Sequence, residues 1–201
     1  MESCLVPLRL DEMDLHVVDS AVRRSLSRSG YTKRRRECEQ AVRWFSQRFP
    51  EQKISALRDV TEEMLWMVKG KMPDRLWRRS RHVVEEDARV LAMVEALQRG
   101  NATETGRLLS ASHKSLRDLF QVSTKELDFL VDFGLKHGAL GARMVGGGFG
   151  GVTIHLVPAE LRENYVSSLQ DAYRQRFRLK AEVIQVRPAP VATACQVTKG
   201  L

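Results

Sequence analysis

The chain has 201 residues, of which 43% are hydrophobic and 29% charged, so it can bury a core and is not a disordered tail. Its three cysteines, Cys4, Cys38 and Cys195, lack metal or redox spacing, and charged residues interrupt the first twenty positions. We therefore expect neither a secreted disulfide scaffold nor a signal peptide. The longest stretch without Lys, Arg, Asp or Glu, residues 144–159, is shorter than the roughly 20 apolar residues that span a bilayer. We expect a cytoplasmic protein with no membrane partner.

The formal net charge is +8, and the arginines that cause it gather in residues 23–36 and 75–81. Clusters of this kind can bind a polyanion. However, Tyr31 and Trp77 are the only aromatic rings near them, and a surface on which nucleic-acid bases stack needs more. We therefore do not expect a nucleic-acid partner. Solvated helix faces, with at most one anion site, account for the charge.

Hydrophobic periodicity predicts helices in the middle of the chain and strands towards both ends. The predicted elements, in chain order, are strands over residues 4–10 and 13–19, helices over 33–48, 61–70, 73–99, 108–120 and 123–135, strands over 139–145 and 151–157, a helix over 160–177 and a strand over 181–187. Ser123 with Glu126 three residues later has the spacing of a capping box, which predicts Ser123 as a helix N-cap. The residues after Pro190 are expected to be a tail.

This order of elements predicts an α+β fold. It suits an antiparallel four-stranded sheet with the ferredoxin-like β-α-β-β-α-β order, covered by helices and carrying extra inserted helices.

The segment Arg143-Met-Val-Gly-Gly-Gly-Phe-Gly-Gly151 is the densest candidate for chemistry. Five glycines among six residues permit positive φ and let backbone N–H groups approach a phosphate or another loop. A G-x-G-x-x-G pattern is present, but a strand follows it, whereas the dinucleotide fingerprint must open a helix. No Walker sequence occurs in the chain. A tight hairpin that merely packs closely remains the alternative at this point.

The other candidates are weaker. His82 and Glu86 are four residues apart, but no H-E-x-x-H sequence or third ligand accompanies them, so we expect no metal site. No nucleophile motif is present. Tyr31 follows Gly30 where the first helix begins, and three arginines follow it. Positive charge in a first turn opposes the helix dipole, so either a negative group from a ligand or missing segment lies nearby, or the turn is solvated.

Several segments together resemble one enzyme family. Gly141-Ala-Arg-Met-Val-Gly-Gly-Gly-Phe-Gly-Gly-Val-Thr153 is similar to the third motif of galactokinases, in the family of small-molecule kinases named for galactose, homoserine, mevalonate and phosphomevalonate. Ser29-Gly-Tyr-Thr-Lys-Arg-Arg-Arg-Glu-Cys-Glu39 resembles the galactokinase segment around a sugar-contacting tyrosine. Further similar segments follow in the family's order: Ala56-Leu-Arg-Asp-Val-Thr61, Arg79-Ser-Arg-His-Val83 and Ser112-His-Lys-Ser-Leu-Arg-Asp118. The resemblance covers about residues 3–188.

The resemblance implies transfer of a phosphoryl group from ATP, with Mg²⁺, to the anomeric hydroxyl of galactose or a related sugar. It implies that Tyr31 contacts the sugar. The glycine-rich active-site loop implied by it consists of Gly146, Gly147, Gly148, Phe149, Gly150 and Gly151. This loop would border the active site and support the phosphate-binding loop. The sugar-gripping motif, the phosphate loop and the catalytic base of the family lie upstream, so no catalytic residue is expected in this chain.

On this basis the chain is expected to be the C-terminal half of a galactokinase-type kinase and inactive alone. Residues 1–30 would link to a missing N-terminal half, residues 31–188 would form the C-terminal domain, and residues 189–201 the tail. A non-catalytic sugar-sensing or interaction protein is the alternative. Val145 stands where the family usually has Thr, and Leu119 where it usually has a second Asp. These two departures could alter the substrate or weaken the activity, but not the fold.

Overall fold

The structure is a computed structural model that describes residue 6 and residues 12–23 and 28–186. The strand predicted over residues 4–10 and the tail predicted over 189–201 lie essentially outside the described residues. Within the described part, no helix combines the length and the apolar character needed to cross a membrane.

The sheet contains four of the five predicted strands and is antiparallel as predicted. It contains β1 (Met13–Asp19), β2 (Gly141–Met144), β3 (Val152–Pro158) and β4 (Glu182–Val186), in the spatial order β2-β3-β1-β4. Every neighbouring pair is antiparallel. This is the ferredoxin-like arrangement, which confirms the α+β fold and the four-stranded antiparallel sheet.

Alternation along β1 shows which sheet face is buried. Asp14, His16 and Val18 are buried, while the residues between them are only half-buried. Side chains of successive strand residues point to opposite faces, so one face of the sheet packs against helices. In the register, His16 lies opposite His155 of β3.

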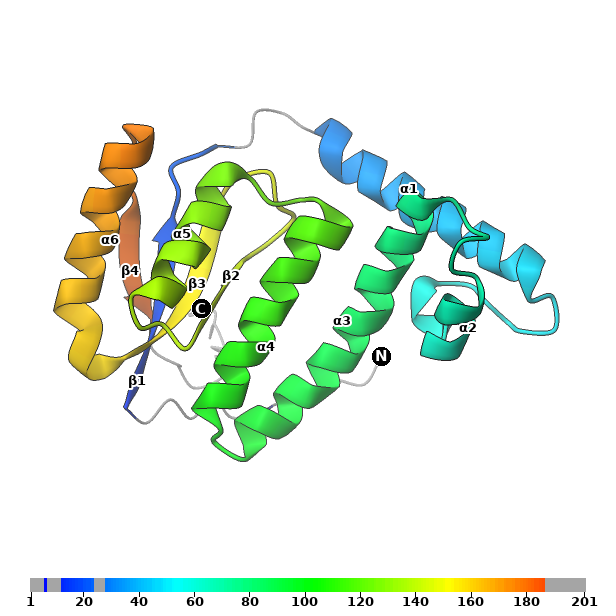
Figure 1. Ribbon diagram of the computed structural model, residues 1–201, viewed down its shortest axis with the longest axis horizontal. Coiled ribbons are helices and arrows are strands. Elements are labelled where there is room, and N and C mark those ends of the chain that lie inside the picture. The colour runs from blue at the N-terminus through cyan, green and yellow to red at the C-terminus, as the bar shows by residue number, and fades with distance from the viewer. Residues whose placement is uncertain (1–5, 7–11, 24–27, 187–201) are drawn as a thin grey trace, which may run out of the picture.

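The helices form two groups (Figure 1). The first group, α4 (Ala102–Ser115), α5 (Lys125–Lys136) and α6 (Arg162–Phe177), covers one face of the sheet. The second group, α1 (Arg28–Arg48), α2 (Glu62–Met67) and α3 (Asp74–Gln98), lies to one side of it. Short helical segments complete the described part of the chain. They are the 3-10 helices η1 (Leu57–Asp59) and η3 (Ala159–Leu161) and the π-helix η2 (Leu116–Phe120), which directly follows α4.

Each group has its own apolar core. Between the sheet and its helices lie Val18, Leu130, Val157, Tyr165, Leu169 and Tyr173. In the second group, α1, α2 and α3 bury Ala41, Phe45, Leu57, Leu65, Leu76 and Trp77. The second group therefore packs as a unit of its own, and the contacts that join it to the sheet layer determine how the two parts are placed.

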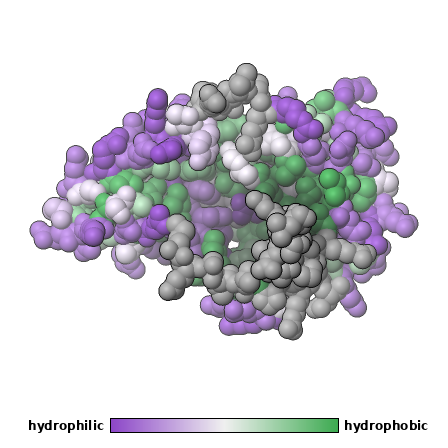
Figure 2. Space-filling view, turned by 180° about the vertical axis from the view of Figure 1, so that it is seen from behind, coloured by the Kyte–Doolittle hydropathy of each residue, from purple (hydrophilic) through white to green (hydrophobic). Residues whose placement is uncertain are grey.

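Several large apolar side chains are exposed on the described surface. Figure 2 shows hydrophobic surface in the middle of the rear view, between hydrophilic surfaces at its two ends. Ile184 of β4 and Val90 and Leu91 of α3 are each more than half exposed.

Three predicted helix starts differ from the structure, and one of them is α4, which begins at Ala102 rather than at residue 108. Helix α1 begins at Arg28 rather than near residue 33. The N-cap of α5 is Thr124, whose hydroxyl accepts the amide of Leu127, and not Ser123. The reason is local, because the Ser123 hydroxyl donates to the carboxylate of Asp128 at 2.5 Å and is therefore not used as the cap.

Helix α4 and strand β2 approach each other at two glycines. A Cβ atom on Gly106 would lie 2.3 Å from the carbonyl oxygen of Leu140, and one on Gly141 would lie 2.1 Å from the carbonyl oxygen of Gly106. Both obstacles are backbone atoms, which cannot rotate away as a flexible side chain could. The contact therefore depends on the missing side chains of both residues.

We predict that Gly106→Ala lowers the free energy of unfolding by about 1–3 kcal/mol, the usual cost of overpacking. Intrinsic helix propensity alone would favour alanine by about 1 kcal/mol, so the sign of the change tests the close approach. The measurement is urea unfolding followed by circular dichroism. Gly100→Asn is the control, since Gly100 has φ +64° and no neighbour within 4 Å of its Cβ position. Equal stability of Gly106→Ala and the parent would contradict the packing described.

Candidate functional site

The glycine loop joins β2 to β3 and follows conformations that few side chains adopt. φ is positive at Gly146, Gly148, Phe149, Gly150 and Gly151, with values from 62° to 118°. Glycine adopts these angles readily because it has no Cβ, whereas Phe149 does so with some strain. The predicted turn is therefore present, and its glycines match the backbone they form.

The backbone of the loop is held by neighbouring loops. The amide of Phe149 donates to the carbonyl of Val122 at 2.7 Å, and the amide of Gly151 donates to the carbonyl of Val22 at 3.1 Å. The carbonyl of Gly151 accepts from both the amide and the hydroxyl of Ser20, at 3.0 and 2.6 Å. The amides of Phe149 and Gly151 are thus committed to protein carbonyls and are not donors for a phosphate.

These contacts leave no room for side chains at two loop positions. A Cβ atom on Gly148 would lie 2.2 Å from the Val122 carbonyl oxygen, and one on Gly150 would lie 2.6 Å from that of Val22. The loop is therefore shaped to fit closely against the residues that follow η2 and β1.

The loop also contacts the first turn of α1, where Tyr31 is located. A Cβ atom on Gly30 would lie 2.8 Å from the ring of Phe149. The first helical turn therefore packs on the loop's own aromatic ring, 119 positions later in the sequence (149 − 30). Tyr31 itself is 62% exposed. The structure brings the backbone beside Tyr31 against the glycine loop and leaves the tyrosine ring accessible.

A buried charge network, made of Arg34, Glu37 and Arg79, lies behind this contact. Glu37 and Arg79 are 3% and 2% exposed. One oxygen of the Glu37 carboxylate accepts from Arg34 Nη1 at 2.9 Å and from Arg79 Nε at 2.8 Å. Arg75 approaches the other oxygen at 3.5 Å. The network joins α1 to α3.

The two arginines also hold the end of the π-helix η2. Arg34 donates to the carbonyls of Phe120 and Gln121 at 2.6 and 3.0 Å. Arg79 donates to the carbonyl of Leu119 and, at 2.8 Å, to the side-chain oxygen of Gln121. Carbonyls at a helix C-terminus lack partners in the helix, so these arginines cap them. Val122 follows Gln121, the C-cap of η2, and its carbonyl accepts the amide of Phe149.

Glu37 stays ionised in this environment. Burial by itself would raise the pKa of Glu37, but the hydrogen bond from Arg79 and the charges of Arg34 and Arg79 outweigh burial and hold the pKa below its ordinary value. A buried carboxylate that lost its partners would be costly, and so would the buried guanidinium left behind.

The network explains part of the basic charge. Arg34 and Arg79 come from the two arginine-rich stretches that were expected to be mainly solvated helix faces. Instead, their negative partners are Glu37 and helix-end carbonyls of the same chain. The positive first turns of α1 therefore have an internal counterpart. The spacing of Arg34 and Glu37 in one helix hinted at this pair, but nothing local in the sequence signals Arg79, which is 42 positions from Glu37.

His82 and Glu86, weighed above as possible ligands, have other partners. The ring of His82 bonds to the hydroxyl of Ser115 at 2.8 Å. Glu86 pairs with Arg89 at 2.7 Å and Arg143 at 3.4 Å. In the described ranges, no three His, Cys, Asp or Glu side chains come together in a way that could hold a metal ion.

Two buried histidines are kept neutral. Both ring nitrogens of His155 are bonded, Nδ1 to the hydroxyl of Tyr165 at 2.5 Å and Nε2 to that of Thr153 at 2.7 Å. Burial, with like charge from neighbouring histidines, lowers the pKa of His155 to about 3. Burial also lowers the pKa of His82 to about 4, against the opposing charge of Glu86.

The two departures from the family pattern occupy different surroundings. The side chain of Val145 is 37% exposed at the start of the glycine loop, and its amide donates to Val152. Leu119 contributes its backbone carbonyl to Arg79, an interaction that does not require an aspartate side chain. Neither residue disturbs the fold.

Comparison with known proteins agrees with this architecture. Residues 93–178 match the family model described as "GHMP kinases C terminal". With the ferredoxin-like sheet and the glycine turn, residues 93–178 carry a GHMP kinase C-terminal domain. The fold alone is shared with mevalonate kinase of L. major, at a TM-score of 0.51 and 22% identity over 89% of this chain and 43% of that one.

Within the family the chain corresponds to the C-terminal half of galactokinases. It is 46% identical to the galactokinase of Thermotoga neapolitana over 92% of this chain and 50% of that protein. It is 43% identical to that of Thermotoga maritima over 86% of this chain and 46% of that protein. The structure of Lactococcus lactis galactokinase complexed with galactose matches at a TM-score of 0.83 and 31% identity, over 89% of this chain and 46% of that one. The chain spans about half the length of these relatives.

We predict that Glu37→Gln lowers the free energy of unfolding by about 3–5 kcal/mol, because it leaves the guanidinium of Arg79 buried without its counter-charge. Glu39→Gln is the matched control. Glu39 lies two residues further along α1 and pairs with Arg35 in solvent, so its loss should cost less than about 1 kcal/mol. Denaturant unfolding of the two variants measures the difference. Similar losses of unfolding free energy in both variants would show that the buried network stabilises the fold no more than the exposed ion pair does.

We also predict that acid destabilises the fold at pH values well above the pKa of ordinary carboxylates. His82 and His155 are neutral when folded, but in the unfolded chain they bind protons below about pH 6.5. Stability should therefore fall as the pH drops from about 6.5 towards 4, by up to about 1.4 kcal/mol per pH unit for each histidine.

Unfolding free energies measured from pH 7 to 4 test the acid effect. His82→Gln should flatten the slope, because it removes one of the two histidines that bind a proton only on unfolding. A parent chain whose stability is constant over this interval would contradict the neutral, buried state of both rings.

Proposed function

We propose that this chain acts as the C-terminal half of a galactokinase-type sugar kinase. The whole enzyme would transfer the terminal phosphoryl group of ATP to the anomeric hydroxyl of galactose or a closely related sugar. The observation that carries the proposal is the glycine loop packed against the turn that bears the exposed Tyr31, in a chain 46% identical to a galactokinase. The related galactokinase from Lactococcus lactis, solved with galactose, supports the sugar class.

Tyr31 is proposed to contact the sugar. Its ring is exposed, and an aromatic ring with a hydroxyl offers an apolar face to sugar C–H groups and a polar atom to a sugar hydroxyl. Its position would be fixed from behind, since the adjacent Gly30 rests on Phe149. Replacing Tyr31 should therefore affect sugar binding more than the fold.

The glycine loop is proposed to support the active site rather than to bind phosphate through its central amides. The amides of Phe149 and Gly151 already donate to Val122 and Val22. The loop's bare backbone can still lie against a phosphate-binding loop contributed by the other half of the enzyme. Phosphoryl transfer depends mainly on positioning and charge stabilisation, so a rigid support has a direct effect on rate.

The groups that would hold ATP and Mg²⁺ are assigned to the other half. Mg²⁺ is usually held by one or two carboxylates together with substrate phosphates. The described residues do not gather a cluster of metal-binding side chains, and the carboxylates of Glu37 and Glu86 are engaged by arginines. The proposed contribution of this chain is to position the sugar and the loop.

A partner half is also proposed to cover exposed apolar side chains of this chain, such as Ile184 and Leu91. The relatives are about twice as long as this chain, so they contain enough protein to do so. Buried apolar surface is the main source of stability in such association.

We predict that the chain alone shows no galactose-dependent ATP consumption in a coupled assay. Co-expression with the remaining half of the Thermotoga neapolitana enzyme should give a complex that turns over. In that complex Tyr31→Phe should mainly raise KM for galactose. Gly147→Val and Gly148→Val should abolish turnover, the latter because its side chain meets the Val122 carbonyl.

Arg43→Ala, an exposed change on α1, serves as the control for activity. Turnover by the chain alone would refute the proposal that the other half holds ATP and the metal. A co-purified complex that binds galactose without consuming ATP would favour the sugar-sensing alternative instead.

A further inference from the structure

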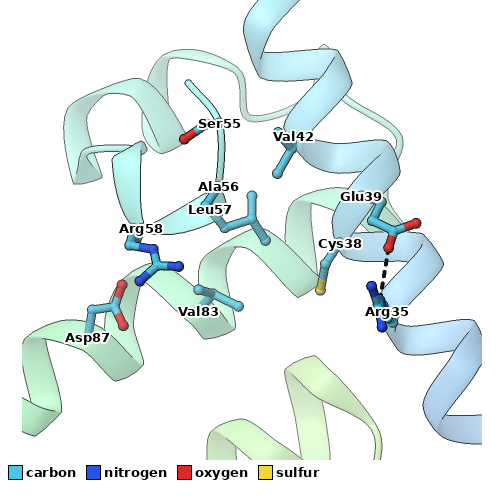
Figure 3. A pocket seen from close by; sticks show the side chains of 10 residues that line it. All are labelled: Arg35, Cys38, Glu39, Val42, Ser55, Ala56, Leu57, Arg58, Val83 and Asp87. Carbon is cyan, nitrogen blue, oxygen red and sulfur yellow. Dashed lines mark hydrogen bonds and ion pairs between the residues drawn. The ribbon is translucent and has the colours of Figure 1, made fainter. Parts of the chain in front are cut away.

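A cleft lies between α1, η1 and α3 (Figure 3), and it is separate from the glycine loop. It encloses about 650 Å³, within the range of about 300–1,000 Å³ typical of small-molecule sites. Neither Tyr31 nor any residue of the glycine loop lines it. Its lining residues are Arg35, Cys38, Glu39, Val42, Ser55, Ala56, Leu57, Arg58, Val83 and Asp87.

The inner wall of the cleft is apolar. It consists of Val42 from α1, Leu57 from η1 and Val83 from α3, and Leu57 is 5% exposed. Cys38 adds its sulfur beside them (Figure 3). Burial raises the pKa of the Cys38 thiol, so it stays protonated and behaves as a small apolar group.

The rim carries charges of both signs. At one end, Arg58 and Asp87 point towards each other in Figure 3, one from η1 and the other from α3. In the part of the chain that the structure describes, Arg58 and Asp87 form no ion pair within 4.0 Å. At the other end, Arg35 pairs with Glu39 at 3.0 Å. The charged side chains of the lining therefore balance, with a cation and an anion available together beside the apolar wall.

The connector that supplies Arg58 is already fixed. The carboxylate of Asp59 accepts the amides of Ser55 and Ala56 and the Ser55 hydroxyl, each at 2.8 Å. These bonds hold the turn in one shape, so little ordering should be needed when a ligand binds.

We propose that this cleft binds a small zwitterion with an apolar side group, the chemistry of a free hydrophobic α-amino acid. Its carboxylate would meet Arg58, its ammonium group Asp87, and its side group the wall of Val42, Leu57 and Val83. A bare phosphate uses only one of the two charges and none of the wall. A neutral sugar uses neither charge. For a ligand of this size in an open cleft, the dissociation constant should be on the order of 1 mM.

Nitrogen-15 correlation spectra of the full chain test the proposal, with L-leucine as the probe. Leucine should shift the amides of Cys38, Leu57 and Val83 in a saturable manner. Three smaller probes each lack one feature: 4-methylpentanoate has no ammonium group, 3-methylbutylamine has no carboxylate, and glycine has no apolar side group. Each should bind at least about fivefold more weakly, since it loses one of the three contacts.

Two variants assign the charged contacts. Arg58→Ala and Asp87→Ala should each weaken leucine binding at least about fivefold, as loss of one charged contact predicts. Arg43→Ala, an exposed arginine of α1 outside the lining, should not change it. Equal binding of leucine to all four chains would overturn the assignment.

A chemical readout keeps the test decisive if a variant folds poorly. Leucine should slow alkylation of Cys38 by iodoacetamide in the parent chain, measured by mass spectrometry, and glycine should not. The proposal fails if leucine changes neither the spectra nor the alkylation rate. It also fails if inorganic phosphate or 4-methylpentanoate perturbs the same amides more strongly than leucine.

Discussion

The buried carboxylate of Glu37 is the point on which the arrangement of this molecule depends. It accepts hydrogen bonds from Arg34 of α1 and Arg79 of α3, and the same two guanidinium groups cap the carbonyls at the end of η2. Ionised groups are expensive to bury, and the opposite charges of the two arginines offset that cost for Glu37. Because the capped turn leads directly to Val122, which holds the amide of Phe149, the network fixes the glycine loop as well as the helices.

Helix α1 links the candidate active site to the rest of the structure. Its first turn lies on the ring of Phe149 and carries Tyr31, and its next turn carries the charge network. Cys38, one residue after Glu37 in α1, lines the cleft between α1, η1 and α3. The glycine loop, in turn, contributes close backbone contact rather than free amides. In the proposed function, this chain would supply placement and rigidity, and the other half would hold the reacting phosphate.

Most of the architecture followed from local sequence signals. Alternating apolar residues marked the strands, and a run of glycines marked the β2–β3 turn, so the four-stranded order was predicted correctly. The cap of α5 was misplaced by one residue because the hydroxyl of Ser123 is engaged by Asp128, a competition that the spacing alone does not reveal. The burial of Arg79 could not be predicted, because its partner Glu37 is 42 positions away. The nearby Arg78 and Arg81 also give Arg79 the appearance of one more residue in a solvated basic stretch. The role of Tyr31 rests on family resemblance and stays a prediction, and local sequence signals do not reveal the specific contact between Gly30 and the Phe149 ring.

Hydrogen exchange at the amide of Phe149 tests the central claim most directly, namely that the Glu37 network holds the glycine loop in place. The amide of Leu156, in the middle of β3 within the buried sheet, provides an internal reference. If the network positions the loop, Glu37→Gln should speed exchange at Phe149 far more than at Leu156, because the capped turn would release Val122 before the sheet opens. Equal acceleration at both amides, or unchanged protection of Phe149, would show that the loop is held independently of Glu37.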